Sequence, residues 1–157
     1  MPVNYAETWV HSFLILVLRP LEGAASRKGL KLVRKFHGED FLAHLDRRFV
    51  EMILNNLVSN AVKYSEEGEI EIELEKVEDR LILQVIDSGV GMSEDFKQKM
   101  FEPFEQESHG NERLFEGTGL GLNITKNLVH LLGGEIQVWS AKKEGTRVRV
   151  EIPLPQS

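Results

Sequence analysis

Cysteine does not occur among the 157 residues, so the chain forms no disulfide framework and offers no thiolate to a metal. Positive charge is in the minority, with 19 Lys and Arg against 25 Asp and Glu and a formal net charge of −6. Nucleic-acid binding needs a clustered basic patch, so we expect no nucleic-acid partner. The longest uninterrupted apolar run, Phe13 to Leu18, is far shorter than the roughly 20 residues of a membrane helix, so we expect no membrane contact. No Walker loop (GxxxxGK followed by Ser or Thr) occurs either.

The remaining composition is that of an ordinary globular domain. Hydrophobic residues make up 41% and charged residues 28% of the chain, which is usual for soluble proteins. No internal repeat or low-complexity linker interrupts the sequence, so we expect residues 1–157 to form a single domain. A chain without cysteine also fits a reducing, cytoplasmic location.

Hydrophobic periodicity predicts helices and strands mixed along the chain. A first helix is expected from Tyr5 to about Ala25, with Asn4 as its N-cap and Gly29 ending it. A second helix is expected after Asp46, as N-cap, and runs to about Tyr64. A third helix over about 120–132 and strands over 30–36, 70–75, 81–86, 136–140 and 147–152 complete the pattern. These elements predict an α+β fold, a two-layer sandwich with a mixed sheet and helices on one face.

The helix expected after Asp46 carries two asparagines on one face. At about 100° per residue, Asn56 and Asn60 lie roughly 40° apart, and Lys63 lies about 20° from Asn56. The apolar residues of the helix fall on the opposite side: Val50, Leu54, Leu57, Val58 and Ala61. An asparagine oxygen suits Mg²⁺ that bridges phosphates. The alternative is that these amides only hydrogen-bond nearby loops.

A first glycine-rich segment follows a predicted strand. Residues 87–92 read DSGVGM, so Asp87 presents an acceptor-only carboxylate at the edge of the sheet, suited to an exocyclic amino group. Gly89 and Gly91 leave room for a flat base against the backbone. An ordinary aspartate-glycine turn would use the same residues.

A second glycine-rich segment opens a predicted helix. Residues 116–122 read EGTGLGL, and the unpaired N–H groups of a first helical turn suit phosphate groups. A plain glycine-rich loop before a helix is the alternative. Between the two segments, Glu102 to Glu116 is mostly polar, which predicts a lid or another functional loop. As a lid, it would become ordered when nucleotide binds.

The motifs together resemble a known family. The asparagine helix, DxGxG, FEPF, GxGxG and a final EGTRVRV strand, in this order, are similar to the catalytic ATP-binding domain of sensor histidine kinases. That domain has the Bergerat fold, shared with type II topoisomerase, heat-shock chaperone and mismatch-repair ATPases. The resemblance covers about Phe49 to Leu154 and implies ATP and Mg²⁺ as the bound cofactors.

Carried over residue by residue, the resemblance implies that Asn60 coordinates Mg²⁺, with Asn56 beside it, and that Lys63 contacts phosphate. Tyr64 would pack near the adenine or ribose, and Asp87 would accept from the adenine amino group. The other implied nucleotide-binding positions are Gly89, Gly91, Gly117, Thr118, Gly119, Leu120, Gly121 and Thr146, with the Leu120 side chain packing within its helix.

The resemblance also implies roles for residues of the predicted lid. Phe101 and Phe104 would anchor its base. Many members place an arginine soon after this phenylalanine pair, where Gln106 stands here. Arg113, later in the lid, is the residue that could take the place of this arginine. The alternative is that Arg113 is only a solvated charge on the lid.

Two features bear on the reaction. The position of Asn56 resembles that of a water-activating glutamate in the ATP-hydrolysing relatives, and an amide has no basic lone pair, so phosphoryl transfer is favoured over hydrolysis. The family's phosphoacceptor motif is absent: His11 is followed by SFL, and we interpret it as a surface or packing histidine. We therefore expect a protein histidine kinase catalytic domain that acts on a histidine of a separate, upstream dimerisation domain and feeds a response regulator. A degenerate, non-catalytic ATP-binding regulatory module and an ATPase of the same fold are the alternatives.

Overall fold

The computed structural model describes residues 2–65, 67–87, 119–141 and 145–155. The elements, in chain order, are β1 (Ala6–Trp9), α1 (Val10–Arg27), β2 (Lys31–Phe36), β3 (Leu42–Leu45), α2 (Arg47–Tyr64), β4 (Glu69–Val77), β5 (Arg80–Asp87), α5 (Gly119–Leu131), β6 (Glu135–Ala141) and β7 (Gly145–Pro153).

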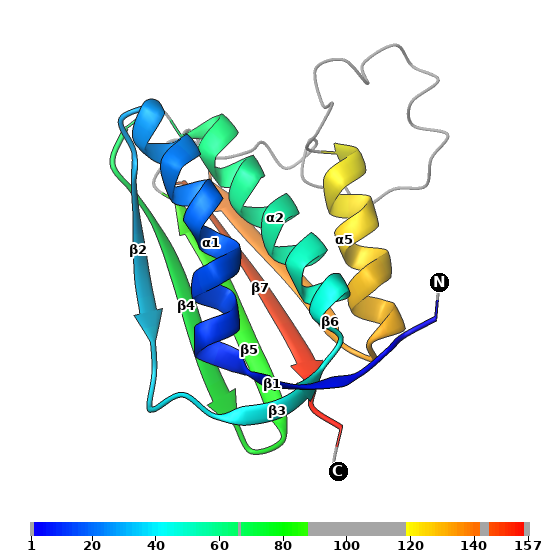
Figure 1. Cartoon of the computed structure of the whole chain (residues 1–157). Helices are drawn as coiled ribbons and strands as arrows, with labels where there is room; N and C mark the ends of the chain where they lie inside the picture. Colours follow the sequence, from blue (N-terminus) through cyan, green and yellow to red (C-terminus); the bar gives the residue numbers. More distant parts are fainter. Residues whose placement is uncertain (1, 66, 88–118, 142–144, 156–157) are drawn as a thin grey trace.

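The described part of the chain forms two layers. A five-stranded sheet has the order β2-β4-β5-β7-β6, with β2 and β4 parallel and the other neighbouring strands antiparallel. The helices α1, α2 and α5 lie together over one face of this sheet, with α2 in the middle and packed against both others (Figure 1). This arrangement confirms the predicted α+β fold with a mixed sheet and helices on one face.

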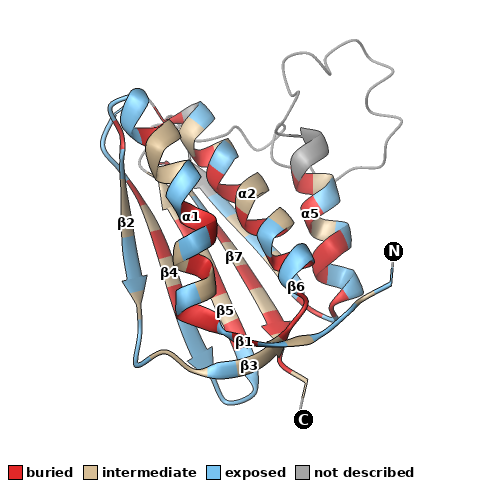
Figure 2. Ribbon diagram, in the orientation of Figure 1, coloured by how far each residue is buried: buried red, intermediate tan, exposed pale blue. Residues whose placement is uncertain are grey.

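The core lies between the helices and the sheet, as the alternation of residues predicts. In β4, Ile70, Ile72 and Leu74 are fully buried, whereas the glutamates between them are partly or fully exposed. In α2, the whole predicted apolar stripe is buried, and Phe49 and Ile53 are buried with it. Figure 2 shows the same division, with buried positions on the facing sides of the two layers. Burial of these side chains is the main force that holds the layers together.

The ends of α2 and α5 follow local signals in the sequence. Asp46 is the N-cap of α2 and accepts a hydrogen bond at Oδ1 from the backbone N–H of Phe49, at 3.0 Å. Helix α5 ends at Leu131, and Gly133 follows with φ of 81°. That left-handed conformation suits glycine and closes the helix. The predicted N-cap of α2 and the predicted extent of α5, to about residue 132, are confirmed.

The start of the first helix was predicted wrongly. Residues from Ala6 to Trp9 form β1, an antiparallel partner of β3, and helix α1 starts only at Val10. Asn4 does not cap the helix; its backbone N–H donates to Asp46 Oδ2 at 2.6 Å. The segment pairs with β3, more than thirty residues later, and periodicity within residues 5–25 cannot reveal that partner.

The N-cap of α1 comes from a distant residue. Asp40 accepts hydrogen bonds from the backbone N–H groups of His11 at 2.7 Å and Ser12 at 3.2 Å, and from the Ser12 hydroxyl at 2.6 Å. Burial alone would raise the pKa of Asp40, but these hydrogen bonds and one from the Phe41 N–H outweigh it and lower the pKa. Asp40 therefore caps the helix as an ionised carboxylate.

Among the described residues, no helix is long and apolar enough to cross a membrane.

Candidate functional site

The ends of two helices and two strands lie together at one end of the sandwich. Helix α2 ends there at Tyr64 and strand β5 ends at Asp87, while β7 begins at Gly145 and α5 at Gly119. This is the upper end of the molecule in Figure 1. The residues that the sequence singles out on α2, β5, β7 and α5 therefore lie at one end of the fold.

The polar face of α2 is confirmed. Asn56 and Asn60 are half-buried and Lys63 is exposed, on the side away from the buried stripe. The Asn60 side-chain nitrogen Nδ2 is buried and has no hydrogen-bond partner among the residues that the structure describes. A polar group buried without a partner costs about 1–3 kcal/mol. The amide of Asn60 therefore has a buried polar end that no described residue satisfies.

The side-chain amide of Asn60 is compatible with Mg²⁺. A neutral amide oxygen is a suitable ligand for a hard cation that keeps most of its waters and bridges phosphates. The two ends of an amide are told apart only by their hydrogen bonds. The nitrogen is a donor and cannot ligate a cation, but no described residue bonds to it, so no hydrogen bond fixes which end of the Asn60 amide lies here, and the oxygen can take this position. Among the described residues, no group of three or more His, Cys, Asp or Glu could hold a metal, so a cation here would rest on Asn60 and the nucleotide.

Asp87 and Thr146 are direct neighbours across two strands. They are register partners in the antiparallel pair of β5 and β7. Side chains alternate between the two faces of a strand, and Asp87 continues the row of Leu81, Leu83 and Val85, which faces the helices. Thr146 continues the equivalent buried row of β7. Both side chains are therefore half-buried on the helix side of the sheet, which suits a shared contact to one end of a ligand.

The beginning of α5 coincides with the second glycine-rich segment. Gly119, Leu120 and Gly121 form its first residues, so their backbone N–H groups belong to the turn that has no intrahelical acceptors. Leu122 is 2% exposed and packs in the core. A helix that opens toward the end of α2 offers backbone donors to an anion.

Several predicted positions lie outside the described residues: Gly89, Gly91, Phe101, Phe104, Arg113, Gly117, Thr118 and the segment from Glu102 to Glu116. The roles assigned to them stay predictions. Tyr64 is the last residue of α2, and its contact with the adenine or ribose also stays a prediction.

Two residues at this end were not singled out from the sequence. Ser65, directly after α2, is fully buried, and its hydroxyl has no hydrogen-bond partner within the described ranges of the chain. Lys28, directly after α1, donates from Nζ to the carbonyl oxygens of Val62 at 2.7 Å and Lys63 at 2.8 Å. A lysine at the end of a helix usually serves its own helix. The sequence gives no sign that Lys28 reaches a second one.

His11 is confirmed as a packing residue. It is 8% exposed, and its ring lies 5.3 Å from that of Phe36 and 5.6 Å from that of Phe41, measured between centroids. A histidine enclosed in this way is not open to receive a phosphoryl group.

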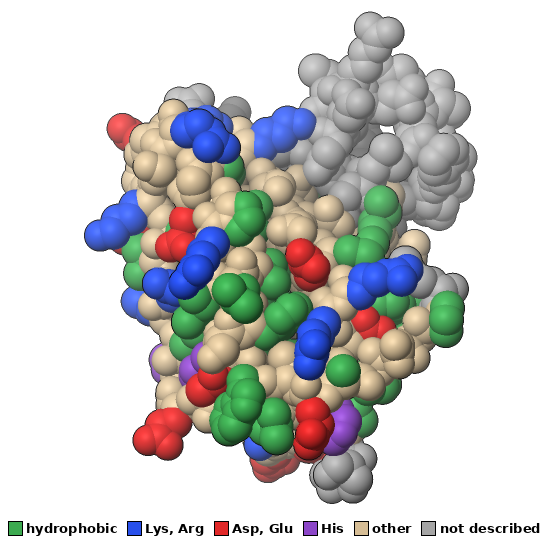
Figure 3. All heavy atoms as spheres, viewed as in Figure 1, with side chains coloured by type: hydrophobic (Ala, Val, Ile, Leu, Met, Phe, Trp, Pro, Cys, Tyr) green, Lys and Arg blue, Asp and Glu red, His purple; other side chains and the backbone are tan. Residues whose placement is uncertain are grey.

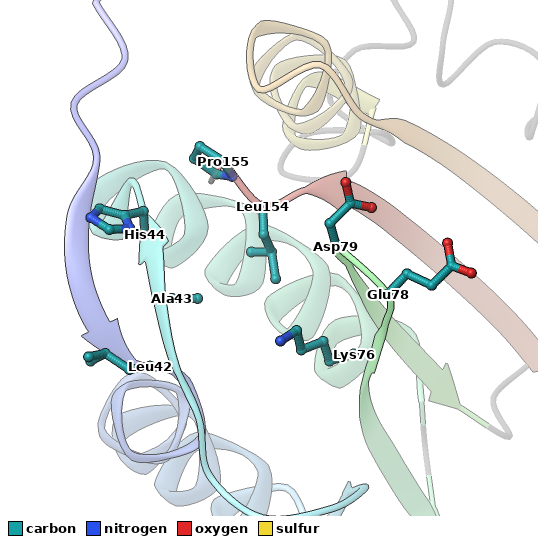
Figure 4. Close-up of a pocket in the computed structure, with 8 residues that line it drawn as sticks. All are labelled: Leu42, Ala43, His44, Lys76, Glu78, Asp79, Leu154 and Pro155. Atoms are coloured by element: carbon teal, nitrogen blue, oxygen red, sulfur yellow. The ribbon is translucent and has the colours of Figure 1, made fainter. Parts of the chain in front are cut away.

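An open groove of about 560 Å³ lies at the opposite end of the fold. Its lining comes from β3, the turn between β4 and β5, and the chain after β7, as Figure 4 shows: Leu42, Ala43, His44, Lys76, Glu78, Asp79, Leu154 and Pro155. No predicted site residue belongs to it, so it is separate from the candidate nucleotide site.

Comparisons with known proteins agree with this geometry. The family described as "Histidine kinase-, DNA gyrase B-, and HSP90-like ATPase" matches residues 45–156. The autoinducer 2 sensor kinase/phosphatase LuxQ of Vibrio parahaemolyticus is 42% identical over 98% of this chain, and LuxQ of Vibrio cholerae is 35% identical over 88% of it. The chain spans only 18% and 16% of the lengths of these two relatives.

Solved structures show the same fold. The nucleotide-free catalytic domain of histidine kinase ThkA superposes with a TM-score of 0.79 at 26% identity, covering 96% of this chain and 95% of that one. Full-length ShkA in complex with AMPPNP gives a TM-score of 0.85 at 25% identity, covering 100% of this chain and 32% of that one. With the family match over most of its length, the chain belongs to the histidine kinase-, DNA gyrase B- and HSP90-like ATPase family and is a catalytic ATP-binding domain of the sensor histidine kinase type.

Proposed function

We propose that this chain binds Mg-ATP at the end where α2, β5, β7 and α5 meet, and transfers the γ-phosphoryl group to a histidine on a separate domain. The observation that carries the proposal is the half-buried amide of Asn60, whose buried nitrogen has no hydrogen-bond partner in the described part of the chain. It stands on the polar face of α2, at the same end of the fold as the Asp87–Thr146 pair.

Each residue has a separate task in this proposal. Asn60, supported by Asn56, holds Mg²⁺, which when bound neutralises phosphate charge. Lys63 contacts phosphate as a point charge. The first turn of α5, with Gly119 and Gly121, presents backbone donors to the phosphates.

The base is held at the sheet. Asp87, as an ionised carboxylate, accepts from the adenine amino group, and Thr146 beside it supports the same contact through its hydroxyl or a water molecule. Tyr64 packs near the adenine or ribose. Catalysis then comes mainly from positioning and charge neutralisation.

The acceptor lies outside this chain in the proposal. His11 is enclosed by Phe36 and Phe41, and Asn56 provides no base that would activate water. The whole chain acts as one cytoplasmic catalytic domain. Its partners are a phosphoacceptor histidine domain and, downstream, a response regulator.

The test uses Asn60→Ala with Asn55→Ala as its matched control. Asn55 is also a half-buried asparagine of α2, but it lies about 140° from Asn60 around the helix. Calorimetry with ATP, with and without Mg²⁺, should show that Mg²⁺ strengthens binding to the parent and to Asn55→Ala but not to Asn60→Ala. Transfer from ATP to a purified phosphoacceptor hairpin of a sensor histidine kinase should be lost in Asn60→Ala alone.

Three outcomes separate the candidate functions. Unchanged metal dependence in Asn60→Ala would refute the role of Asn60. ATP binding without transfer by the parent would identify a regulatory module. Phosphate release without an acceptor would identify an ATPase.

A further inference from the structure

The ends of α1 and α2 are joined by a single side chain. Lys28 Nζ lies 2.7 Å from the carbonyl oxygen of Val62 and 2.8 Å from that of Lys63. Helix α2 ends at Tyr64, so these two carbonyls belong to the last turn, where no further helical N–H group is available. The preceding carbonyl, that of Ala61, accepts from the backbone N–H of Ser65 at 3.0 Å.

Lys28 is itself firmly placed. It is the C-cap residue of α1, and its backbone N–H donates to Ala25 at 3.0 Å. The N–H of Leu30 donates to the same carbonyl at 2.9 Å, across Gly29 with φ of 83°. This is the hydrogen-bonded turn that glycine allows at the end of a helix. Leu30 is 4% exposed and anchors the turn in the core.

The carbonyls that Lys28 holds belong to the turn that carries the proposed phosphate contacts. Asn60 begins that turn, and Lys63 and Tyr64 end it. The end of a helix also carries partial negative charge, which would oppose a polyphosphate bound nearby. An ammonium group within hydrogen-bonding distance of two terminal carbonyls offsets that charge and fixes the turn. Figure 3 shows basic side chains at this upper end of the molecule, where the two helices end.

We propose that Lys28 is a positioning residue for the nucleotide site: it fixes the last turn of α2 and offsets the negative end of that helix, although it touches no nucleotide itself. This inference rests on the proposed function, because it assigns Lys28 a role in the same Mg-ATP site. In this role, Lys28 makes the end of α1 part of the site, because its hydrogen bonds connect the ends of the two helices.

The test compares Lys28→Met, Lys28→Arg and Lys31→Met. Methionine keeps an apolar stem and removes both the charge and the hydrogen bonds, whereas arginine keeps the charge and the donors. Lys31 is an exposed lysine of β2, close in the chain. Its replacement removes the same charge from the neighbourhood without touching α2.

Two measurements are made on the whole chain. Hydrogen exchange without nucleotide should be faster at the amides of Lys63 to Ser65 in Lys28→Met than in the parent. The dissociation constant of Mg-ATP should rise about three- to tenfold in Lys28→Met, in line with the usual strength of a cation at a helix end. It should be within about twofold of the parent in Lys28→Arg and Lys31→Met.

The results separate this inference from the proposed function. If the parent binds no Mg-ATP, the proposed function fails and the positioning role fails with it, whatever the exchange shows. If the parent binds and Lys28→Met binds equally well, the positioning role is overturned while the proposed function stands. An equal loss in Lys31→Met would also overturn it, since the effect would then be one of net charge.

Discussion

Replacing Asp40 by alanine should destabilise the first turn of α1. The Asp40 carboxylate caps this 18-residue helix from the loop between β2 and β3. It accepts from two backbone N–H groups of the first turn and from the Ser12 hydroxyl. Trp9, at the N-cap position itself, makes no side-chain cap. The first turn would therefore lose its only side-chain acceptor among the described residues.

The expected cost follows from the type of contact. Loss of an N-cap side chain costs about 1–2 kcal/mol of unfolding free energy. For a chain of this size each kcal/mol lowers the melting temperature by about 2–4 °C. We therefore expect Asp40→Ala to melt roughly 2–8 °C below the parent at pH 7. Glu39→Ala removes a neighbouring exposed carboxylate and should leave the melting temperature unchanged.

The pH dependence has a defined sign. Because the fold lowers the pKa of Asp40, the ionised carboxylate stabilises the folded state above its unfolded pKa of about 3.9. That contribution disappears as the pH falls through the lower, folded pKa. The difference between the parent and Asp40→Asn should thus be constant from pH 7 to 5 and shrink below about pH 4. Thermal melts by circular dichroism at each pH would measure it. A difference that grows toward acid pH would refute the reasoning, as would equal melting of Asp40→Ala and the parent at pH 7.

Two further substitutions test the packing of the fold and the base contact. Gly134→Ala should destabilise by about 1–3 kcal/mol or prevent folding, because the added Cβ would clash with the carbonyl oxygen of Glu151 and lie 2.7 Å from Ile152 Cγ2. Gly23→Ala is its control in urea unfolding, because the nearest atom to the added Cβ there is 3.7 Å away. Alanine at this helical position should stabilise α1 by about 0.5–1 kcal/mol. A loss of stability in Gly23→Ala, or no loss in Gly134→Ala, would contradict the packing. Asp87→Asn should weaken ATP binding by about 1.5–3 kcal/mol, or roughly 10- to 150-fold, because a donor would face the adenine amino group. Equal affinity in calorimetry would remove Asp87 from the base contact.

Much of the fold was predictable because its signals are local. Asp46 marks the beginning of α2 through a contact three residues long, and Gly133 marks the end of α5 through its own backbone conformation. The alternation of β4 and the helical spacing of the apolar residues in α2 record which face is buried. Each of these depends on spacings of two to four residues, which a sequence displays directly.

The polar face of α2 was predictable for the same reason. Its amides occupy one side of a single helix, so the spacing of Asn56 and Asn60 is enough to place them together. The order of the motifs then identified the family, and the comparisons confirmed it.

The tertiary structure alone decided the contacts between distant segments. Three such contacts join residues 28 to 39 positions apart: the pairing of β1 with β3, the cap of α1 by Asp40, and the hydrogen bonds from Lys28 to the last turn of α2. The register that sets Asp87 beside Thr146 spans 59 positions, from 87 to 146. Such contacts depend on how the elements pack, and any lysine or aspartate at the end of an element would look the same in the sequence. Local patterns therefore determined which faces are apolar and which residues suit ATP, while packing determined which charges close the helices and which side chains meet at the site.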